Sequence, residues 1–140
     1  MYISDILNHT EITVHLYGNI CSKIDNHKNI IKYGFVDNFD TIYDDAFITI
    51  CPTKYGSGTK IKINESISNN IPVLAHKDQA NSSILEHCIN GYVYDDLESF
   101  LNGMEFIRTK YINVVKNCKN TVKNARFAES VFEKTFFGNK

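Results

Sequence analysis

Five short apolar runs, separated by longer segments that mix polar and apolar residues, limit the fold of this chain more than any other feature. The runs cover residues 12–17, 30–33, 47–51, 72–75 and 91–94. Their apolar residues occupy neighbouring positions rather than every second one, so we expect each run to form a strand that is buried on both faces. Strands of this kind form parallel sheets that helices cover on both sides. The sequence therefore predicts an α/β fold.

The segments between and after these runs are predicted to be helical. Predicted helices cover residues 2–8, 39–44, 59–68, 82–87 and 97–125. The last of them is the most regular, because its apolar residues recur at spacings of 4, 3, 4 and 3 from Tyr111 to Ala125. That spacing places them in one stripe along a helix. We therefore expect a single long amphipathic helix over residues 97–126.

The composition is that of one ordinary globular domain. The chain has 140 residues, a net charge of -1, and no Gly-, Ser- or Pro-rich linker, so we expect residues 1–140 to form one domain. The balanced charge argues against a polycation that binds nucleic acid. The four cysteines form no CxxC pair, and no apolar run approaches the roughly 20 residues of a membrane span. These features predict reduced thiols and a cytoplasmic protein.

A row of basic residues lies along the long C-terminal helix, on a different face from the apolar stripe. It consists of Lys116, Lys119, Lys123 and Arg126, and no acidic residue lies between Glu105 and Glu129. One interpretation is the solvated face of a packed helix. The other is a surface that contacts a phosphate-rich partner such as anionic lipid headgroups. The second interpretation would place the protein peripherally at a membrane surface.

The segment from residue 48 to residue 65 carries the clearest chemistry. A predicted buried strand enters a loop that contains Gly56 and Gly58, and a helix is predicted to begin at about Thr59. The two glycines leave room for a ligand to approach the backbone, and Thr59 can cap the helix. The free N–H groups at the start of the helix attract an anion. In open α/β folds, ligands bind at the carboxyl ends of the strands, where this loop lies.

Three charged residues follow the loop on the same predicted helix. Lys60 and Lys62 add positive charge to the anion site, and Glu65 can accept hydrogen bonds from a vicinal diol such as a ribose. The segment lacks the Gly-Lys-Ser/Thr ending of the P-loop and the third glycine of the dinucleotide fingerprint. The residues alone are therefore compatible with a phosphate-binding loop and with a plain tight turn between strand and helix.

Three stretches of the sequence resemble, in the correct order, the donor-binding part of GT-B glycosyltransferases of the retaining family 4 type, the glycosyl transferases group 1. The longest is GSGTKIKINESISNNIPVLA at residues 56–75. Upstream, IIKYGFVD at 30–37 and IYDDAF at 42–47 match a second family stretch. Downstream, SILE at 83–86 and NGYVYDD at 90–96 match a third. The resemblance covers roughly residues 12–100 and implies a Rossmann-like parallel sheet, one half of the GT-B architecture.

The resemblance also implies a nucleotide-sugar site for transfer of a sugar from UDP- or GDP-sugar to an acceptor, with no bound metal and no other cofactor. By position, Phe35 and Val36 after Gly34 would meet the nucleobase, Thr59 and Lys60 the phosphates, and Glu65 the ribose. The full donor-binding set that we predict is Gly34, Phe35, Val36, Gly56, Ser57, Gly58, Thr59, Lys60, Lys62 and Glu65. No catalytic residue is assigned. Charge and helix dipole would stabilise the departing diphosphate.

The sequence departs from the family pattern at three points. Ser57 stands eight positions before Glu65, where many members carry a second glutamate, and Asn70 replaces a glycine. Asparagine tolerates the left-handed backbone conformation, so the second change is mild. The chain supplies one of the two GT-B domains, without a counterpart of that domain's first strand. We therefore expect an N-terminal acceptor half in another chain or in a second copy, and an incomplete enzyme without it.

Two other functions remain open at this stage. The first is an interaction module on a degenerate GT-B half-domain, which would bind no nucleotide. The second is a relative of the nucleotide-sugar epimerases, which share the architecture. The five histidines show no metal-ligand spacing. Among them, His76 follows the run at 72–75 and either lines the cleft or is an ordinary loop residue, and Asp95 and Asp96 are expected to start the helix at Leu97.

Overall fold

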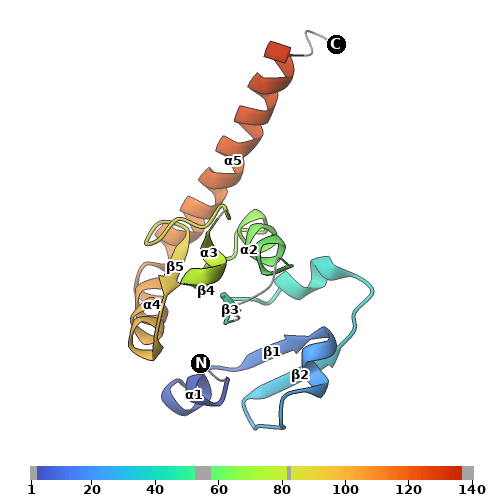
Figure 1. The fold of residues 1–140 in the computed structure, drawn as a ribbon, viewed down its shortest axis with the longest axis vertical. Coiled ribbons are helices and arrows are strands. Elements are labelled where there is room, and N and C mark those ends of the chain that lie inside the picture. Colours follow the sequence, from blue (N-terminus) through green and yellow to red (C-terminus); the bar gives the residue numbers. More distant parts are fainter. Residues whose placement is uncertain (1–2, 53–57, 82, 137–140) are drawn as a thin grey trace. The chain divides into compact units, whose positions relative to one another are not determined.

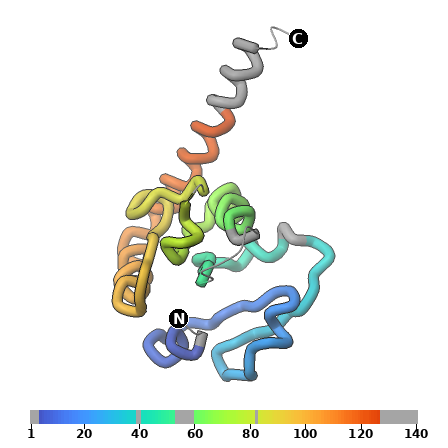
Figure 2. Tube along the Cα trace, in the orientation of Figure 1, coloured from blue at the N-terminus to red at the C-terminus, as the bar shows by residue number. Residues whose placement is uncertain are grey.

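The structure is a computed structural model that describes residues 3–52, 58–81 and 83–136, without the side chains of residues 3, 39, 40, 58, 59 and 127–136. Figure 2 draws in grey the residues whose placement is uncertain. Contacts within the chain divide it into two units, Met1–Ala46 and Phe47–Lys140. Each unit has its own parallel sheet.

The first unit is built on two parallel strands. It contains α1 (Ile3–His9), β1 (Val14–Tyr17), the 3-10 helix η1 (Gly18–Ser22), β2 (Ile30–Gly34) and the 3-10 helix η2 (Phe39–Tyr43). β1 pairs with β2 in parallel, as Figure 1 shows. On one face the ring of Tyr33 stacks on Tyr17, with 4.6 Å between the ring centroids. Tyr33 Oη also lies 3.0 Å from Nδ1 of His15.

The second unit contains a three-stranded parallel sheet and most of the helices. Its elements are β3 (Thr49–Cys51), α2 (Gly58–Ser68), β4 (Val73–His76), α3 (Lys77–Ala80), β5 (Gly91–Tyr94), α4 (Leu97–Thr109) and α5 (Tyr111–Phe136). The strand order is β3-β4-β5, and both pairings are parallel. All four residues of the central strand β4 are buried. Five parallel strands form as predicted, but they make two sheets, β1-β2 and β3-β4-β5, instead of the single sheet expected. β1 and β3 each begin two residues later than expected.

Helices α2 and α5 cover one face of this sheet. The core there joins Val73 and Ala75 of β4 to Ile63 and Ile67 of α2 and to Cys118 of α5. All five side chains are fully buried. Burial of each larger aliphatic side chain contributes about 1.5–3 kcal/mol, so this cluster is a main source of the unit's stability.

Helix α4 covers the opposite face. A Cβ atom added to Gly103 would lie 2.6 Å from Leu74 Cδ1 of β4 and 2.6 Å from Tyr92 Cδ1 of β5, so only glycine allows this close approach. Phe100 of α4 packs edge-on against the ring of Tyr94, at 5.1 Å between centroids. The sheet thus has helices on both faces, as the sequence predicts for an α/β fold.

The helix predicted at residues 82–87 is wrong over residues 83–87, and residue 82 lies outside the described residues. Asn90 is fully buried and supplies hydrogen-bond partners that a helix would otherwise provide. Its Oδ1 accepts from the Glu86 N–H at 2.7 Å, and its Nδ2 donates to the Ile84 carbonyl at 2.9 Å. Asn64 Oδ1 of α2 accepts from the Ile84 N–H at 3.1 Å. Because side chains satisfy this backbone, residues 83–87 stay irregular, and the helix forms earlier as the single turn α3.

The single helix expected over residues 97–126 is divided at Lys110 into α4 and α5. α4 packs on β5 and β4, whereas α5 packs on α2, which covers the other face of the sheet. One straight helix cannot follow both faces, so the chain turns at Lys110. The apolar spacing hid this turn because Ile107 lies four residues before Tyr111, so the spacing of the stripe continues across Lys110. The segment at 39–44 is also different from the prediction, since η2 is a 3-10 helix and not an α-helix.

Candidate functional site

The candidate site lies at the carboxyl edge of the sheet in the second unit. β3, β4 and β5 run parallel and end at Cys51, His76 and Tyr94, so these residues lie along one edge. Gly56 and Ser57 of the predicted loop lie outside the described residues. α2 begins at Gly58, so Thr59 lies in its first turn and does not precede the helix as expected. The phosphate site predicted at the start of this helix therefore centres on the turn at residues 58–61.

Helix α2 offers an electropositive first turn at this edge. It is 11 residues long and has no acidic residue in its first turn. Lys60 is half-buried there, and Lys62 and Glu65 are exposed. At about 100° per residue, Lys62 and Glu65 lie on one face of the helix, about 60° apart, whereas Lys60 lies on the other flank. Lys62 and Glu65 therefore share one face of α2, and Lys60 lies on the opposite side of the helix.

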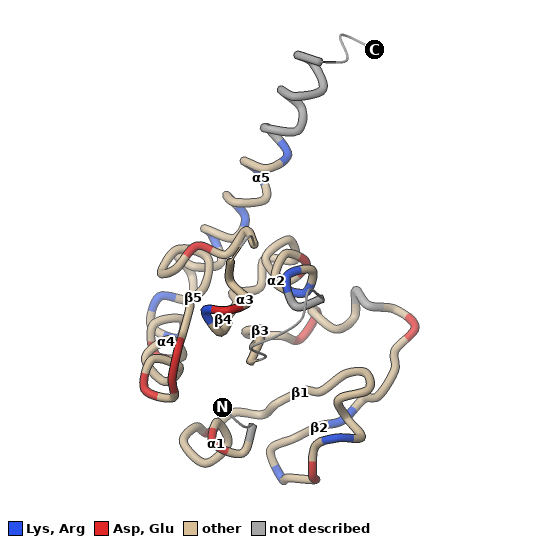
Figure 3. Tube along the Cα trace, in the orientation of Figure 1, with Lys and Arg blue, Asp and Glu red and all other residues tan. Residues whose placement is uncertain are grey.

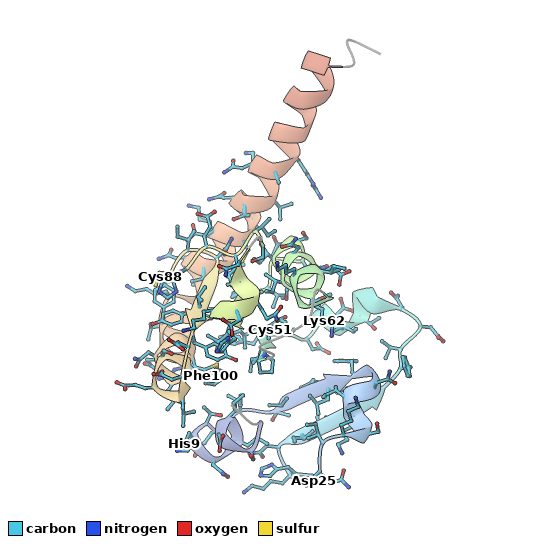
Figure 4. All side chains as sticks on the ribbon, in the orientation of Figure 1. His9, Asp25, Cys51, Lys62, Cys88 and Phe100 are labelled. Carbon is cyan, nitrogen blue, oxygen red and sulfur yellow. The ribbon has the colours of Figure 1, made fainter. Side chains whose placement is uncertain are left out.

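The charge of Lys62 affects the thiol of Cys51, which ends β3. Burial raises the pKa of Cys51 to about 11, and the positive charge of Lys62 partly opposes that rise. Figure 4 labels both residues, Cys51 on β3 and Lys62 on α2. Because thiolate is the reactive form, the Cys51 thiol is inert near neutral pH. Cys51 is therefore a buried residue at the carboxyl edge, close enough to Lys62 to be affected by its charge.

An ion pair joins the ends of the other two strands. Lys77 Nζ donates to Asp95 Oδ2 at 3.1 Å, and this hydrogen bond raises the pKa of Lys77. Both side chains are more than half exposed. Lys77 is not among the residues predicted for the site. Its position directly after a buried parallel strand is the signal that would have found it.

His76 has a local structural task. Its side chain is buried, and Nδ1 accepts from the Asp78 N–H at 3.2 Å, which caps α3. The ring also meets the edge of Tyr94 at 5.5 Å between centroids. These contacts account for His76 as a helix cap at the end of β4. The expected start of the helix at Leu97 is confirmed, because Asp96 and Ser99 form a capping box.

Tyr94 brings a buried hydroxyl to the same edge. The residue is 1% exposed, and its Oη has no hydrogen-bond partner within the described part of the chain. Burial raises the pKa of Tyr94, so the hydroxyl keeps its proton. The Oε1 atom of Gln79 in α3 is in the same situation. Neither group was predicted for the site, since neither residue type stands out at the end of an apolar run.

Phe35 and Val36, which are predicted to meet a nucleobase, lie in the first unit together with Gly34. Gly34 ends β2 with a φ of 68°, which glycine adopts without strain. Phe35 follows it and is 79% exposed, and Val36 is half-buried. The remaining seven residues of the predicted donor set belong to the second unit. The predicted set is therefore divided between the two units.

The replacement of the family glycine by Asn70 behaves as expected. Asn70 has a φ of 63°, in the left-handed region. Its N–H donates to the Ile67 carbonyl at 2.9 Å, and the Ile71 N–H donates to the Ser66 carbonyl at 2.9 Å. These bonds close the end of α2 and direct the chain into β4. The departure at residue 70 leaves the strand–helix–strand unit of the candidate site intact.

Comparisons with known proteins agree with this architecture. The sequence model of the family described as Glycosyl transferases group 1 matches residues 3–109. Among solved structures, the chain is similar in fold to Alr3699/HepE from Anabaena, whose crystal structure was determined in complex with UDP, with a TM-score of 0.61 and 15% sequence identity. The similarity covers 94% of this chain and 44% of the HepE chain. No curated protein sequence matches the chain.

Proposed function

The chain belongs to the family of glycosyl transferases group 1, and from this premise we propose that it is the half of a glycosyltransferase that binds the nucleotide-sugar donor. The observation that carries the proposal is the start of α2, which opens at the carboxyl edge of a parallel sheet and carries Lys60 and Lys62 with no acidic residue in its first turn. Free backbone N–H groups and fixed positive charge are suited to a diphosphate.

In this proposal α2 stabilises the leaving group of the reaction. Transfer of the sugar leaves negative charge on the diphosphate, and the helix N-terminus with Lys60 and Lys62 stabilises that charge without rearranging. Glu65, about two turns further on, accepts hydrogen bonds from the ribose hydroxyls. The exposed Phe35 and the half-buried Val36, in the loop after Gly34, meet the base. No metal or other cofactor takes part.

The acceptor half of the enzyme comes from outside these residues. The chain spans less than half the length of HepE, which supports a second domain in a longer protein, another chain or a second copy. HepE was crystallised in complex with UDP, so UDP is the first donor nucleotide to test and GDP the second. The acceptor site and the residues that act on it would lie in that second half.

A thermal-shift titration tests donor binding on the chain itself. At a hundred times the Kd, a ligand stabilises the folded state by about 2.7 kcal/mol, which raises the Tm by several degrees in a domain of this size. We expect UDP or GDP to produce this shift and ADP to produce none. Lys60→Ala and Glu65→Ala should each reduce it, whereas Lys28→Ala, an exposed lysine of the first unit, should leave it unchanged.

Two results would contradict the proposal. If no uridine or guanosine nucleotide shifts the Tm, the alternative of an interaction module that binds no nucleotide replaces it. If a shift survives both Lys60→Ala and Glu65→Ala, the nucleotide binds elsewhere. Circular dichroism of each variant before titration separates loss of binding from loss of folding.

A further inference from the structure

The first half of α5 presents a continuous row of cations to solvent. Lys116, Lys119, Lys123 and Arg126, here called the basic ridge, follow one another at spacings of 3, 4 and 3 residues. At 3.6 residues per turn they occupy an arc of about 80° on the helix. All four side chains are exposed. Ile112 lies in the same arc one turn before the ridge and is 83% exposed. Figure 3 shows the basic positions following one another along α5.

The opposite side of α5 packs against the rest of the second unit. Val114 is 1% exposed and Cys118 is 0% exposed. The ring of Tyr111 stacks on Phe47 at 4.0 Å between centroids. These contacts fix the orientation of the helix and leave the ridge as the part that another surface can touch. Among the described helices, none is both long and apolar enough to cross a membrane.

Acidic groups do not neutralise the ridge within the described part of the chain. The described side chains of α5, residues 111–126, include no acid. The ion pairs found among the described residues join Lys77 to Asp95 and Arg108 to Glu105, so none uses a ridge cation. Glu86 lies on a different flank of the helix, where it lines a groove with Asn117, Asn120 and Asn124. A chain of net charge -1 thus concentrates positive charge along one line.

We propose that the basic ridge binds the surface of a bilayer that contains anionic lipids. From Ile112 to Arg126 the helix is about 21 Å long at 1.5 Å per residue, so a straight ridge of this length can contact a flat anionic surface along all four cations. Lysine stems reach the headgroups while their carbon chains lie along the interface. The exposed Ile112 at the start of the ridge adds an apolar contact with the interfacial region. This inference does not rest on the proposed donor site.

Sedimentation with vesicles tests the proposal on the whole chain. The purified protein is mixed with vesicles of phosphatidylcholine alone, or of phosphatidylcholine with about one-third phosphatidylglycerol, at 0.1 M NaCl. We expect binding to the anionic vesicles only, and weaker binding at 0.5 M NaCl because salt screens the charges. Each lysine near an anionic surface contributes about a fivefold gain, so Lys119→Gln/Lys123→Gln should lower the partition coefficient about 30-fold.

The matched control removes two exposed lysines elsewhere. Lys23→Gln/Lys28→Gln changes the net charge equally but lies in the first unit, and should lower binding less than threefold. Equal losses of vesicle binding in the two variants would show that net charge alone attracts the protein, and would overturn the proposal that the basic ridge binds. Binding to neutral vesicles, or no binding to either type, would also overturn it. Binding to a DNA duplex in place of anionic vesicles would replace the proposal with a nucleic-acid surface. Glutamine retains helix propensity, and circular dichroism confirms folding.

Discussion

Substitution of Asn90 tests the packing of the segment at 83–86, because the Asn90 side chain makes hydrogen bonds to Glu86, Ile84 and Thr121. Its Oδ1 accepts from the Glu86 N–H at 2.7 Å, and its Nδ2 donates to the Ile84 carbonyl at 2.9 Å and to Thr121 Oγ1 at 3.0 Å. The residue is 0% exposed. Asn90→Ala removes all three bonds and leaves the Glu86 N–H and the Ile84 carbonyl, both in partly buried bonds, without that partner. The irregular segment at 83–86 would lose its link to α5.

The expected loss of stability follows from these bonds. Each net hydrogen bond contributes about 0.5–1.5 kcal/mol, and each buried group left unpaired costs about 1–3 kcal/mol. Asn90→Ala should therefore lower the free energy of unfolding by about 3–4 kcal/mol. A domain of this size has a total of roughly 7–20 kcal/mol at 0.05–0.15 kcal/mol per residue, so the variant should remain folded.

Urea unfolding followed by circular dichroism measures this loss. Asn69→Ala is the matched control, because Asn69 is exposed and its Nδ2 donates to the Glu65 carbonyl of the same helix, at 2.8 Å. The control should change stability by less than about 0.5 kcal/mol. If Asn90→Ala costs less than about 1 kcal/mol, water or another conformation replaces its bonds, and these bonds do not explain why residues 83–87 form no helix.

Backbone packing, helix capping and thiol burial can each be tested in the same way. Gly91→Ala would place a Cβ 2.2 Å from a backbone carbonyl oxygen of β4, so it should lower the free energy of unfolding by about 3 kcal/mol in urea titrations. Asp96→Ala should lower the Tm at pH 7 and lose this effect as the pH falls below about 4, because the Ser99 N–H lowers the pKa of Asp96 in the folded state. In the native chain, a thiol reagent at pH 8 should modify the exposed Cys88 rapidly. It should modify Cys51 only when the chain unfolds, because burial raises the pKa of that thiol to about 11. Rapid labelling of Cys51 would contradict its burial.

The sequence predicts the strands of this fold well because their signal is local. Runs of apolar residues mark β4 and β5 almost to the residue, and the tolerance of Asn70 for a left-handed backbone follows from its side chain alone. The errors arise where distant residues decide the outcome. Asn64 and Asn90 satisfy the backbone near Ile84. No periodicity in the segment 82–87 contains that information.

In the candidate site too, the sequence predicts the features that depend on neighbouring residues and misses those that depend on distant ones. The position of α2 after β3 follows from the order of strand, glycine loop and helix, and so does its electropositive start. The ion pair of Lys77 with Asp95 and the buried hydroxyl of Tyr94 depend on which strands are neighbours, and the sequence does not state this directly. The roles assigned to the donor-binding residues remain predictions, since they depend on how the two units meet a ligand.

An NMR titration shows which residues a nucleotide contacts. Amide resonances of the 15N-labelled chain are followed as UDP is added, with ADP as the control. We expect amides at residues 58–62 of α2 and at 34–36 after β2 to shift together and saturate with one Kd, because both groups would contact one nucleotide. Shifts confined to other parts of the chain, or no shifts with UDP or GDP, would contradict a nucleotide-sugar site built from these residues.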